Sequence, residues 1–220
     1  RASADNVPTE LMATHYAQRA SAGLLIAEAT MAMPGNGAFG NEPGIHSEAQ
    51  VAGWKQVTDA VHAAGGRIFA QLWHVGRVSH TSLQPGNAAP VSSSALVAEG
   101  VKVFVDPQGR GAQAGGGEMV QHSAPRALAV EEIREIVRYF GQGARRAEAA
   151  GFDGVELIGS AGYLIAEFLS VATNHREDAY GGSLENRMRF LTEIIAEIGS
   201  QVSPDFPVIV RLSGTDFVEG

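Results

Sequence analysis

Arg67-Ile68-Phe69-Ala70-Gln71-Leu72 is a short and almost continuous apolar run, and three similar runs lie elsewhere in the chain. They are Leu24-Leu25-Ile26-Ala27-Glu28, Gly154-Val155-Glu156-Leu157 and Pro207-Val208-Ile209-Val210-Arg211-Leu212. Strands that are buried on both faces, as in parallel sheets, have this pattern. The sequence therefore predicts at least four parallel strands.

Amphipathic helices are predicted before and between these strands, at residues 9–22, 47–64, 130–150 and 183–199. In the first, Leu11, Tyr16 and Ala20 recur at helical spacing. Ser47 and Ser183 are suited to cap the second and fourth helices. Glycines follow the apolar stripes, as is typical of helix C-termini.

The alternation of helix and strand indicates parallel βαβ units, which occur in open doubly wound sheets and in closed barrels. Gly35, Gly37 and Gly40 have the G-x-G-x-x-G spacing after the first strand, but they do not open a helix, because the next predicted helix begins at residue 47. This disfavours an open dinucleotide-binding sheet. The fold class is therefore predicted to be α/β, of the (β/α)₈ TIM-barrel type. A complete barrel needs eight strands and about 250 residues. With about four strands in residues 1–220, we expect one incomplete barrel domain that lacks the first strand and the last three. The chain does not start with Met, so we expect it to begin inside a longer gene product.

Residues 81–126 interrupt the pattern and are rich in Gly, Ser, Pro and Ala. Val101-Lys102-Val103-Phe104-Val105 is predicted to form one arm of a hairpin, with Gly115-Gly116-Gly117 near its tip. A loop that follows a barrel strand lies on the catalytic face. We therefore expect this Gly/Ser/Pro-rich hairpin insertion to act as a lid.

The composition excludes several classes of protein. The net charge of −8 leaves no excess of basic side chains to neutralise phosphates, so nucleic-acid binding is not expected. No apolar run is long enough to span a bilayer. With 0 cysteines there are no disulfides or thiolate nucleophiles, and a cytoplasmic location is expected. The sequence leaves the oligomeric state open and is compatible with a homo-oligomer.

Polar residues are expected where the strands end, because barrel active sites collect at the C-terminal ends of strands. These residues are Glu28, Ala29, Thr30, Gln71, Trp73, His74, Arg77, Ser160, Gly162, Tyr163 and Arg211. The set contains no paired carboxylates, no cluster of metal ligands and no Ser-His-Asp arrangement. Gln and Arg can bond the carbonyls and nitrogens of a ring, so the set suits a planar heterocycle better than hydrolysis. Arg211 as an interior ion-pair partner of Glu156 or Glu28 is the structural alternative.

Two motifs resemble those of the old yellow enzyme family, the FMN-dependent ene-reductases. They are Gln71-Leu72-Trp73-His74-Val75-Gly76-Arg77 and the longer Thr173-Asn174-His175-Arg176-Glu177-Asp178-Ala179-Tyr180-Gly181-Gly182-Ser183-Leu184-Glu185-Asn186-Arg187. Pro43-Gly44-Ile45 and Pro125-Arg126-Ala127-Leu128 match in order and spacing. The resemblance implies a TIM barrel that binds FMN, takes hydride from NADH or NADPH and reduces an activated C=C bond of a small molecule, either an enone or a dienoyl compound.

The resemblance also implies roles for single residues. Ala29 matches a position whose backbone lies against the flavin, and Gln71 matches the side chain that bonds the flavin pyrimidine ring. Arg211 matches the cation near flavin N1 and O2, where negative charge accumulates on reduction. Tyr163 matches the tyrosine that lies over the flavin and protonates the substrate carbon.

Two positions depart from the family pattern. Ile158 and Ala161 stand where typical members have a His and an Asn (or a second His) that bond the substrate carbonyl, and neither side chain donates a hydrogen bond. The stretch from Gly159 to Leu169 is similar to the 2,4-dienoyl-CoA reductase branch, which also lacks this pair but has Glu in place of Ala161. This departure leaves open another flavin reaction, such as 2,4-dienoyl-CoA reduction or amine oxidation. The missing strands leave open a second alternative, an inactive barrel fragment without tight FMN binding.

Overall fold

The computed structural model describes residues 1–105 and 117–215. Its α-helices are α1 Glu10–Ala17, α2 Glu48–Ala63, α3 Val130–Ala149, α4 Leu164–Leu169 and α5 Leu184–Gln201. Its strands are β1 Leu25–Met31, β2 Ile68–Trp73, β3 Val91–Ser92, β4 Lys102–Val105, β5 Glu118–Gln121, β6 Arg126–Ala127, β7 Gly154–Gly159 and β8 Val208–Leu212. Short 3₁₀ turns lie at Ala20–Ala22, Thr81–Leu83 and Pro85–Asn87.

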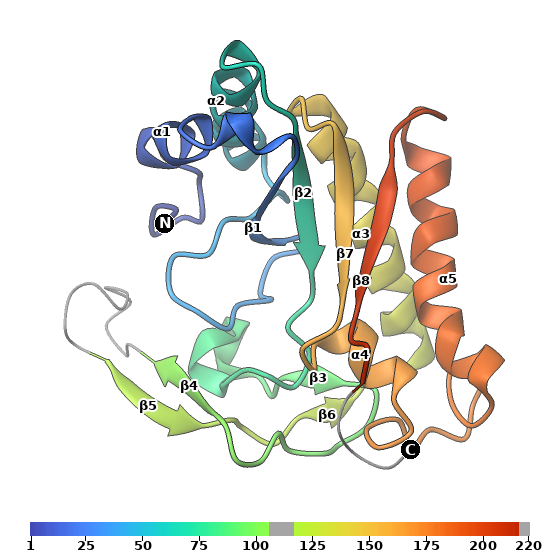
Figure 1. The fold of residues 1–220 in the computed structure, drawn as a ribbon. Coiled ribbons are helices and arrows are strands. Elements are labelled where there is room, and N and C mark those ends of the chain that lie inside the picture. Colours follow the sequence, from blue (N-terminus) through green and yellow to red (C-terminus); the bar gives the residue numbers. More distant parts are fainter. Residues whose placement is uncertain (106–116, 216–220) are drawn as a thin grey trace.

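The main sheet has 4 strands in the order β1-β2-β7-β8, and each neighbouring pair is parallel. The order runs in one direction along the chain, whereas a doubly wound sheet reverses its order at a switch point. Helices α3 and α5 lie together on one side of β7 and β8 (Figure 1). Helices on one face and strands in sequential order are the arrangement of a (β/α)₈ barrel wall, which confirms the predicted fold class.

The core lies between the sheet and the helices. Ala70, Leu72, Val155 and Leu157 point from β2 and β7 into a buried cluster, and each is completely buried. The helices contribute apolar stripes to the same cluster, which include Trp54, Val57, Val61, Ile133, Phe140, Phe190 and Ile194. Because side chains alternate along a strand, the residues between these core positions lie on the opposite face of the sheet, which is the interior face of the barrel.

Three of the four predicted helices form as expected. Ser47 caps α2 in a capping box with Gln50, and the Ser183 hydroxyl accepts from the backbone N–H of Asn186 at the start of α5. The prediction for residues 9–22 was wrong in extent, because α1 ends at Ala17 and a separate 3₁₀ turn follows. Leu11 is 72% exposed, since the stripe of α1 that packs on the core is Met12, Ala13 and Tyr16.

The hairpin predicted in the insertion is confirmed, because β4 pairs with β5 in antiparallel register. Gly115 and Gly116 lie outside the described residues. The insertion also contains β3, which pairs in parallel with β6. These two-residue strands and the six-residue α4 are too short to show a periodicity, and for that reason the sequence did not predict them.

Candidate functional site

The candidate site residues of β1 and β2 lie side by side across the sheet. Ala29 is the register partner of Gln71, and Gln71 is in turn the partner of Glu156 on β7. Ile158 lies two residues after Glu156 and pairs with Arg211 on β8. Residues two apart on a strand share a face. The fold therefore brings Ala29, Gln71, Ile158 and Arg211 onto the interior face, near the C-terminal ends of the four strands.

Gln71 and Glu156 form a buried polar pair on this face. The Gln71 Nε2 amide donates to Glu156 Oε1 at 2.5 Å. Arg211 is exposed, and within residues 1–105 and 117–215 its guanidinium forms no hydrogen bond or ion pair. The alternative in which Arg211 pairs with Glu156 or Glu28 is therefore not what the described part of the chain shows.

Three aromatic rings stand at the end of β2. Trp73 stacks on Phe39 with an interplanar angle of 2°, and meets Tyr163 edge-on at a centroid distance of 4.8 Å. Ile158 and Val75 are buried in one cluster with Trp73, against which Tyr163 packs. Ring and aliphatic side chains thus form an apolar wall beside the polar row.

Tyr163 is the N-cap residue of α4 and is held by backbone contacts. The Leu164 N–H donates to the His74 carbonyl at 3.1 Å, and the Glu167 N–H donates to the Tyr163 carbonyl at 2.9 Å. Burial, and secondarily the Glu42 carboxylate, raise the pKa of Tyr163, so its hydroxyl holds its proton at neutral pH.

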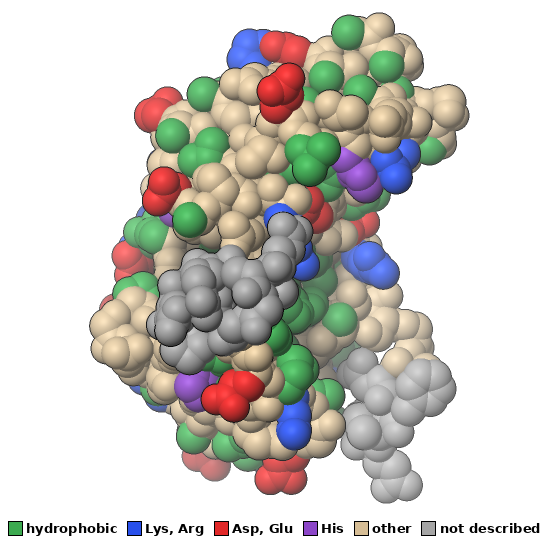
Figure 2. All heavy atoms as spheres, turned by 90° about the vertical axis from the view of Figure 1, so that its left-hand side faces the viewer, with side chains coloured by type: hydrophobic (Ala, Val, Ile, Leu, Met, Phe, Trp, Pro, Cys, Tyr) green, Lys and Arg blue, Asp and Glu red, His purple; other side chains and the backbone are tan. Residues whose placement is uncertain are grey.

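A cavity of about 410 Å³ lies in front of Tyr163. It is lined by Arg1, His15, Tyr16, Glu28, Ala29, Phe39, Glu42, Trp73 and Tyr163. Figure 2 views the molecule from the side of the N-terminus, where apolar, basic and histidine side chains lie near one another. Two of the predicted site residues, Ala29 and Tyr163, therefore share one cavity with aromatic walls and two carboxyl groups.

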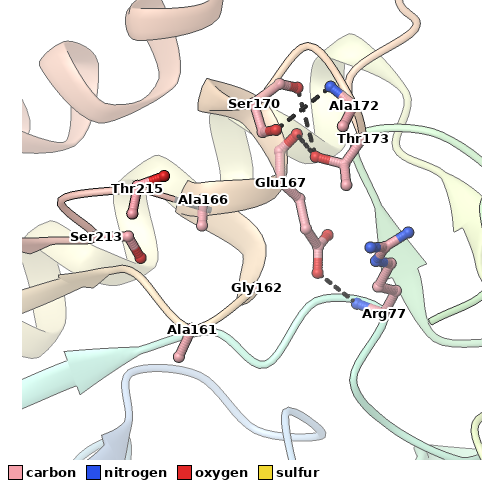
Figure 3. Close-up of a pocket in the computed structure, with 10 residues that line it drawn as sticks. All are labelled: Arg77, Ala161, Gly162, Ala166, Glu167, Ser170, Ala172, Thr173, Ser213 and Thr215. Carbon is pink, nitrogen blue, oxygen red and sulfur yellow. Dashed lines mark hydrogen bonds between the residues drawn. The ribbon is translucent and has the colours of Figure 1, made fainter. Parts of the chain in front are cut away.

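A second cavity, of about 460 Å³, is lined in part by the loop that precedes α4 and by α4 itself (Figure 3). Its lining includes Arg77, Ala161, Glu167, Ser213 and Thr215. Ala161 therefore lines a different cavity from Tyr163, and Ile158 is only 6% exposed and lines neither. Neither of these two cavities, as lined by the described residues, contains both predicted substrate positions.

The described part of the chain contains neither a cluster of metal ligands nor a membrane-spanning helix. The described ranges hold no group of three or more His, Cys, Asp or Glu side chains that could bind a metal ion. Over the same ranges, no helix combines the length and apolar character needed to cross a bilayer.

A comparison with known families settles the ancestry of the chain. The sequence model of the NADH:flavin oxidoreductase / NADH oxidase family matches residues 1–220. The chain belongs to this family. The resemblance to the old yellow enzymes is thereby confirmed, as is the barrel to which the four-stranded sheet belongs.

Several members of the NADH:flavin oxidoreductase family are similar in sequence. A rice protein named 12-oxophytodienoate reductase 7 is 44% identical over 208 residues, which are 94% of this chain and 50% of that protein. A probable flavin mononucleotide-dependent alkene reductase from Leishmania infantum is 42% identical over 213 residues, with 93% and 57% covered. The chain thus spans about half the length of the curated relatives that it matches.

Solved structures of the family have the same fold. Morphinone reductase superposes with a TM-score of 0.89 at 46% identity, over 96% of this chain and 55% of that one. The old yellow enzyme homologue from Zymomonas mobilis superposes with a TM-score of 0.85 at 42% identity, over 96% and 56%.

Two buried carboxyl groups line the cavities of this chain and were not predicted from its sequence. Glu42 is 2% exposed and Glu167 is 1% exposed. Burial raises the pKa of Glu42 to about 7 and that of Glu167 to about 8. The one sequence signal is weak: Glu167 is the only charged residue within the apolar run Leu164-Ile165-Ala166-Glu167-Phe168-Leu169. No sequence pattern marks Glu42 as buried, because glutamates in loops are mostly exposed.

Proposed function

We propose that the protein carrying this chain is an FMN-dependent oxidoreductase that uses NADH or NADPH to reduce an activated C=C bond of a small molecule. The observation that carries the proposal is the arrangement of Ala29, Gln71 and Arg211 on one face at the strand ends, with Tyr163 beside them. Membership of the family and the names of the similar proteins, which include an alkene reductase, support it.

The residues fit a flavin ring. The Trp73 indole N–H is buried, and among the described residues it has no hydrogen-bond acceptor. Arg211 presents a cation that no described carboxylate neutralises. A flavin ring carries carbonyl oxygens and ring nitrogens that accept from such donors, and it gains negative charge on reduction. We infer that Gln71, Arg211 and the backbone at Ala29 would hold FMN.

Bound FMN would supply the transfer of hydride from a nicotinamide to one alkene carbon. Tyr163 would hold, at its hydroxyl, the proton for the other carbon, since burial keeps the phenol protonated. The positive charge of Arg211 would stabilise the negative charge that develops on reduction. Phe39, Trp73 and Ile158 would exclude water from the reacting carbons.

The test is to load the full-length protein that carries this chain with FMN, reduce it with NADH or NADPH, and follow reoxidation by cyclohexenone in stopped flow. We expect Tyr163→Phe to slow reoxidation by on the order of a hundredfold, the scale of a lost general acid, while reduction by the nicotinamide is unchanged. Tyr139→Phe on α3 is the matched control and should change neither step. A full-length protein that is colourless and takes up no FMN would contradict the proposal. The alternative of an inactive barrel fragment predicts that residues 1–220 alone bind FMN weakly, and tight, stoichiometric binding by them would contradict that alternative.

A second candidate is another flavin reaction, such as dienoyl thioester reduction or amine oxidation. Ile158 favours it, because this buried side chain lies in the apolar wall and offers no hydrogen-bond donor to a substrate carbonyl. The reduced protein should then be reoxidised faster by a dienoyl-CoA than by cyclohexenone, or the oxidised protein should be reduced by an amine. Fast turnover of cyclohexenone would rule against this candidate.

Two further features of the protein belong to the proposal. The lack of cysteine favours a cytoplasmic location, which cell fractionation would test. A homo-oligomer is compatible with the sequence, and sedimentation of the purified protein would test it.

A further inference from the structure

The Glu42 carboxyl group closes a tight turn of the loop that follows β1. Glu42 Oε1 accepts from the backbone N–H of Ala38 at 3.0 Å and from the backbone N–H of Phe39. Glu42 Oε2 accepts from the same Ala38 N–H at 3.3 Å. Because Glu42 and Ala38 are both buried, the carboxyl group is the partner that satisfies these two donors in place of water.

The backbone on the C-terminal side of this turn is anchored to the rest of the fold. The Glu42 carbonyl accepts from Asn6 Nδ2 at 2.6 Å, and the Pro43 carbonyl accepts from the Met31 N–H at the end of β1 at 2.9 Å. The Asn41 carbonyl accepts from the Ala2 N–H at 3.1 Å. The Glu42 side chain therefore ties the backbone of Phe39 to this anchored backbone. The Phe39 side chain is 41% exposed, so burial alone does not fix it.

Phe39 is one of the three aromatic rings at the end of β2. It stacks on Trp73, and Trp73 meets Tyr163 edge-on. All three rings and Glu42 line the cavity of about 410 Å³. We propose that Glu42 is a positioning residue, whose hydrogen bonds to the Phe39 turn hold Trp73, and through it Tyr163, in place beside the cavity. The catalytic consequence rests on the proposed function, whereas the positioning itself does not.

The turn should respond to pH, because its closing group titrates. Burial raises the pKa of Glu42 to about 7, against the opposing effect of the two backbone N–H groups and Arg1. A neutral carboxyl group is a weaker acceptor than a carboxylate. Above pH 7 the turn is therefore held firmly, and below pH 7 it loosens. The other charged or titratable groups that share a cavity with Glu42 are Arg1, His15, Tyr16, Glu28, His46 and Tyr163.

The experiment follows the indole N–H signal of Trp73 by ¹⁵N NMR of the full chain between pH 5.5 and 8.5. The chain has 2 tryptophans, so loss of a signal in Trp73→Phe assigns it. We expect the parent signal to shift with a midpoint near pH 7. Glu42→Gln keeps an oxygen acceptor but cannot ionise, so its signal should not shift with pH. Glu42→Ala should displace the signal at every pH.

Glu48→Gln is the matched control. It makes the same chemical change at an exposed glutamate that lies six residues after Glu42. The transition should persist in this variant. A transition that survives in Glu42→Gln would overturn the proposal and point to a neighbouring histidine. Should Glu42→Ala fail to fold, Glu42→Gln still gives the answer.

A second readout tests whether the Glu42 carboxylate acts on Tyr163 at the site. The Glu42 charge contributes to the raised pKa of Tyr163, and it is present when Tyr163 titrates. In Glu42→Gln, ¹³C NMR of labelled tyrosine, assigned with Tyr163→Phe, should show a lower pKa for Tyr163. An unchanged Tyr163 titration would overturn the link between Glu42 and the site. Neither NMR readout needs turnover, so failure of the proposed alkene reduction is recorded separately.

Discussion

A methyl group added to the Cα of Gly76 would lie 2.0 Å from Glu167 Oε1. The loop after β2 thus passes directly over the buried carboxyl group of α4, with no room for a side chain. Glu167 Oε1 accepts from the Arg77 N–H at 2.8 Å, and Glu167 Oε2 accepts from the Ser92 hydroxyl at 2.8 Å (Figure 3 draws the Arg77 bond). Because Tyr163 caps α4, this contact ties the position of Tyr163 to the end of β2.

Gly76→Ala should therefore destabilise the protein for two reasons. Gly76 has a φ of +63°, which costs a residue with a Cβ about 1–2 kcal/mol, and the Cβ also displaces Glu167. Gly86→Ala is the matched control, since Gly86 has a φ of +62° and nothing within 4 Å of an added Cβ. In urea unfolding, Gly76→Ala should lose at least about 2 kcal/mol more than Gly86→Ala, as expected of an overpacked site. Equal losses would show that Glu167 can move aside freely.

The carboxyl group of Glu167 should also make stability depend on pH. Its pKa is raised to about 8 by burial, so between pH 4.5 and 8 the folded chain holds a proton that the unfolded chain releases. The contribution of Glu167 to stability is therefore fully present below pH 4.5 and is lost as the pH rises to 8. Glu167→Gln cannot ionise. Relative to this variant, the parent should lose about 2–3 kcal/mol of unfolding free energy between pH 5.5 and 7.5.

The measurement for Glu167 is a series of urea unfolding curves across this range. Glu48→Gln, which alters an exposed glutamate, should retain the pH dependence of the parent. Parallel curves for the parent and Glu167→Gln would mean that Glu167 is already ionised in the folded state at low pH.

The sequence predicted what local patterns encode. The apolar runs predicted β1, β2, β7 and β8, and the position of Gln71 and Arg211 within those runs placed both near the C-terminal ends of their strands. The two cavities were not predictable, because they depend on how loops distant in sequence fold over the strand ends. Glu42 shows why: its partners are backbone N–H groups, which every residue except proline has. Ile158 and Ala161 are likewise separated by a turn with a left-handed residue at Ala161, which no sequence pattern predicted.

That turn is strained at Ala161, whose φ is +58°. An alanine in this region costs about 1–2 kcal/mol that glycine avoids. Ala161→Gly should therefore stabilise the chain by about 1 kcal/mol in thermal or urea unfolding, less what the more flexible unfolded chain takes back. Ala172→Gly is the control, because Ala172 lines the same cavity and has no positive φ. Ala172→Gly should be neutral or destabilising. A loss of stability in Ala161→Gly would contradict the interpretation that the backbone at Ala161 is strained.

The two substrate positions should respond differently when donors are introduced. Ile158 packs against Trp73 and Tyr163, so the imidazole of Ile158→His would lie beside the Tyr163 cavity, whereas Ala161→Asn would add its amide to the second cavity. If alkene reduction occurs at Tyr163, Ile158→His should speed reoxidation by cyclohexenone by about tenfold or more, since a donor to the substrate carbonyl is worth that much or more. Ala161→Asn alone should leave this rate within about twofold. Burial of the imidazole should cost about 1–3 kcal/mol of stability, so rates are compared at a temperature where both variants are folded. A larger gain from Ala161→Asn than from Ile158→His would mean that substrate binds in the cavity lined by Ala161 and Glu167 and not in the cavity lined by Tyr163.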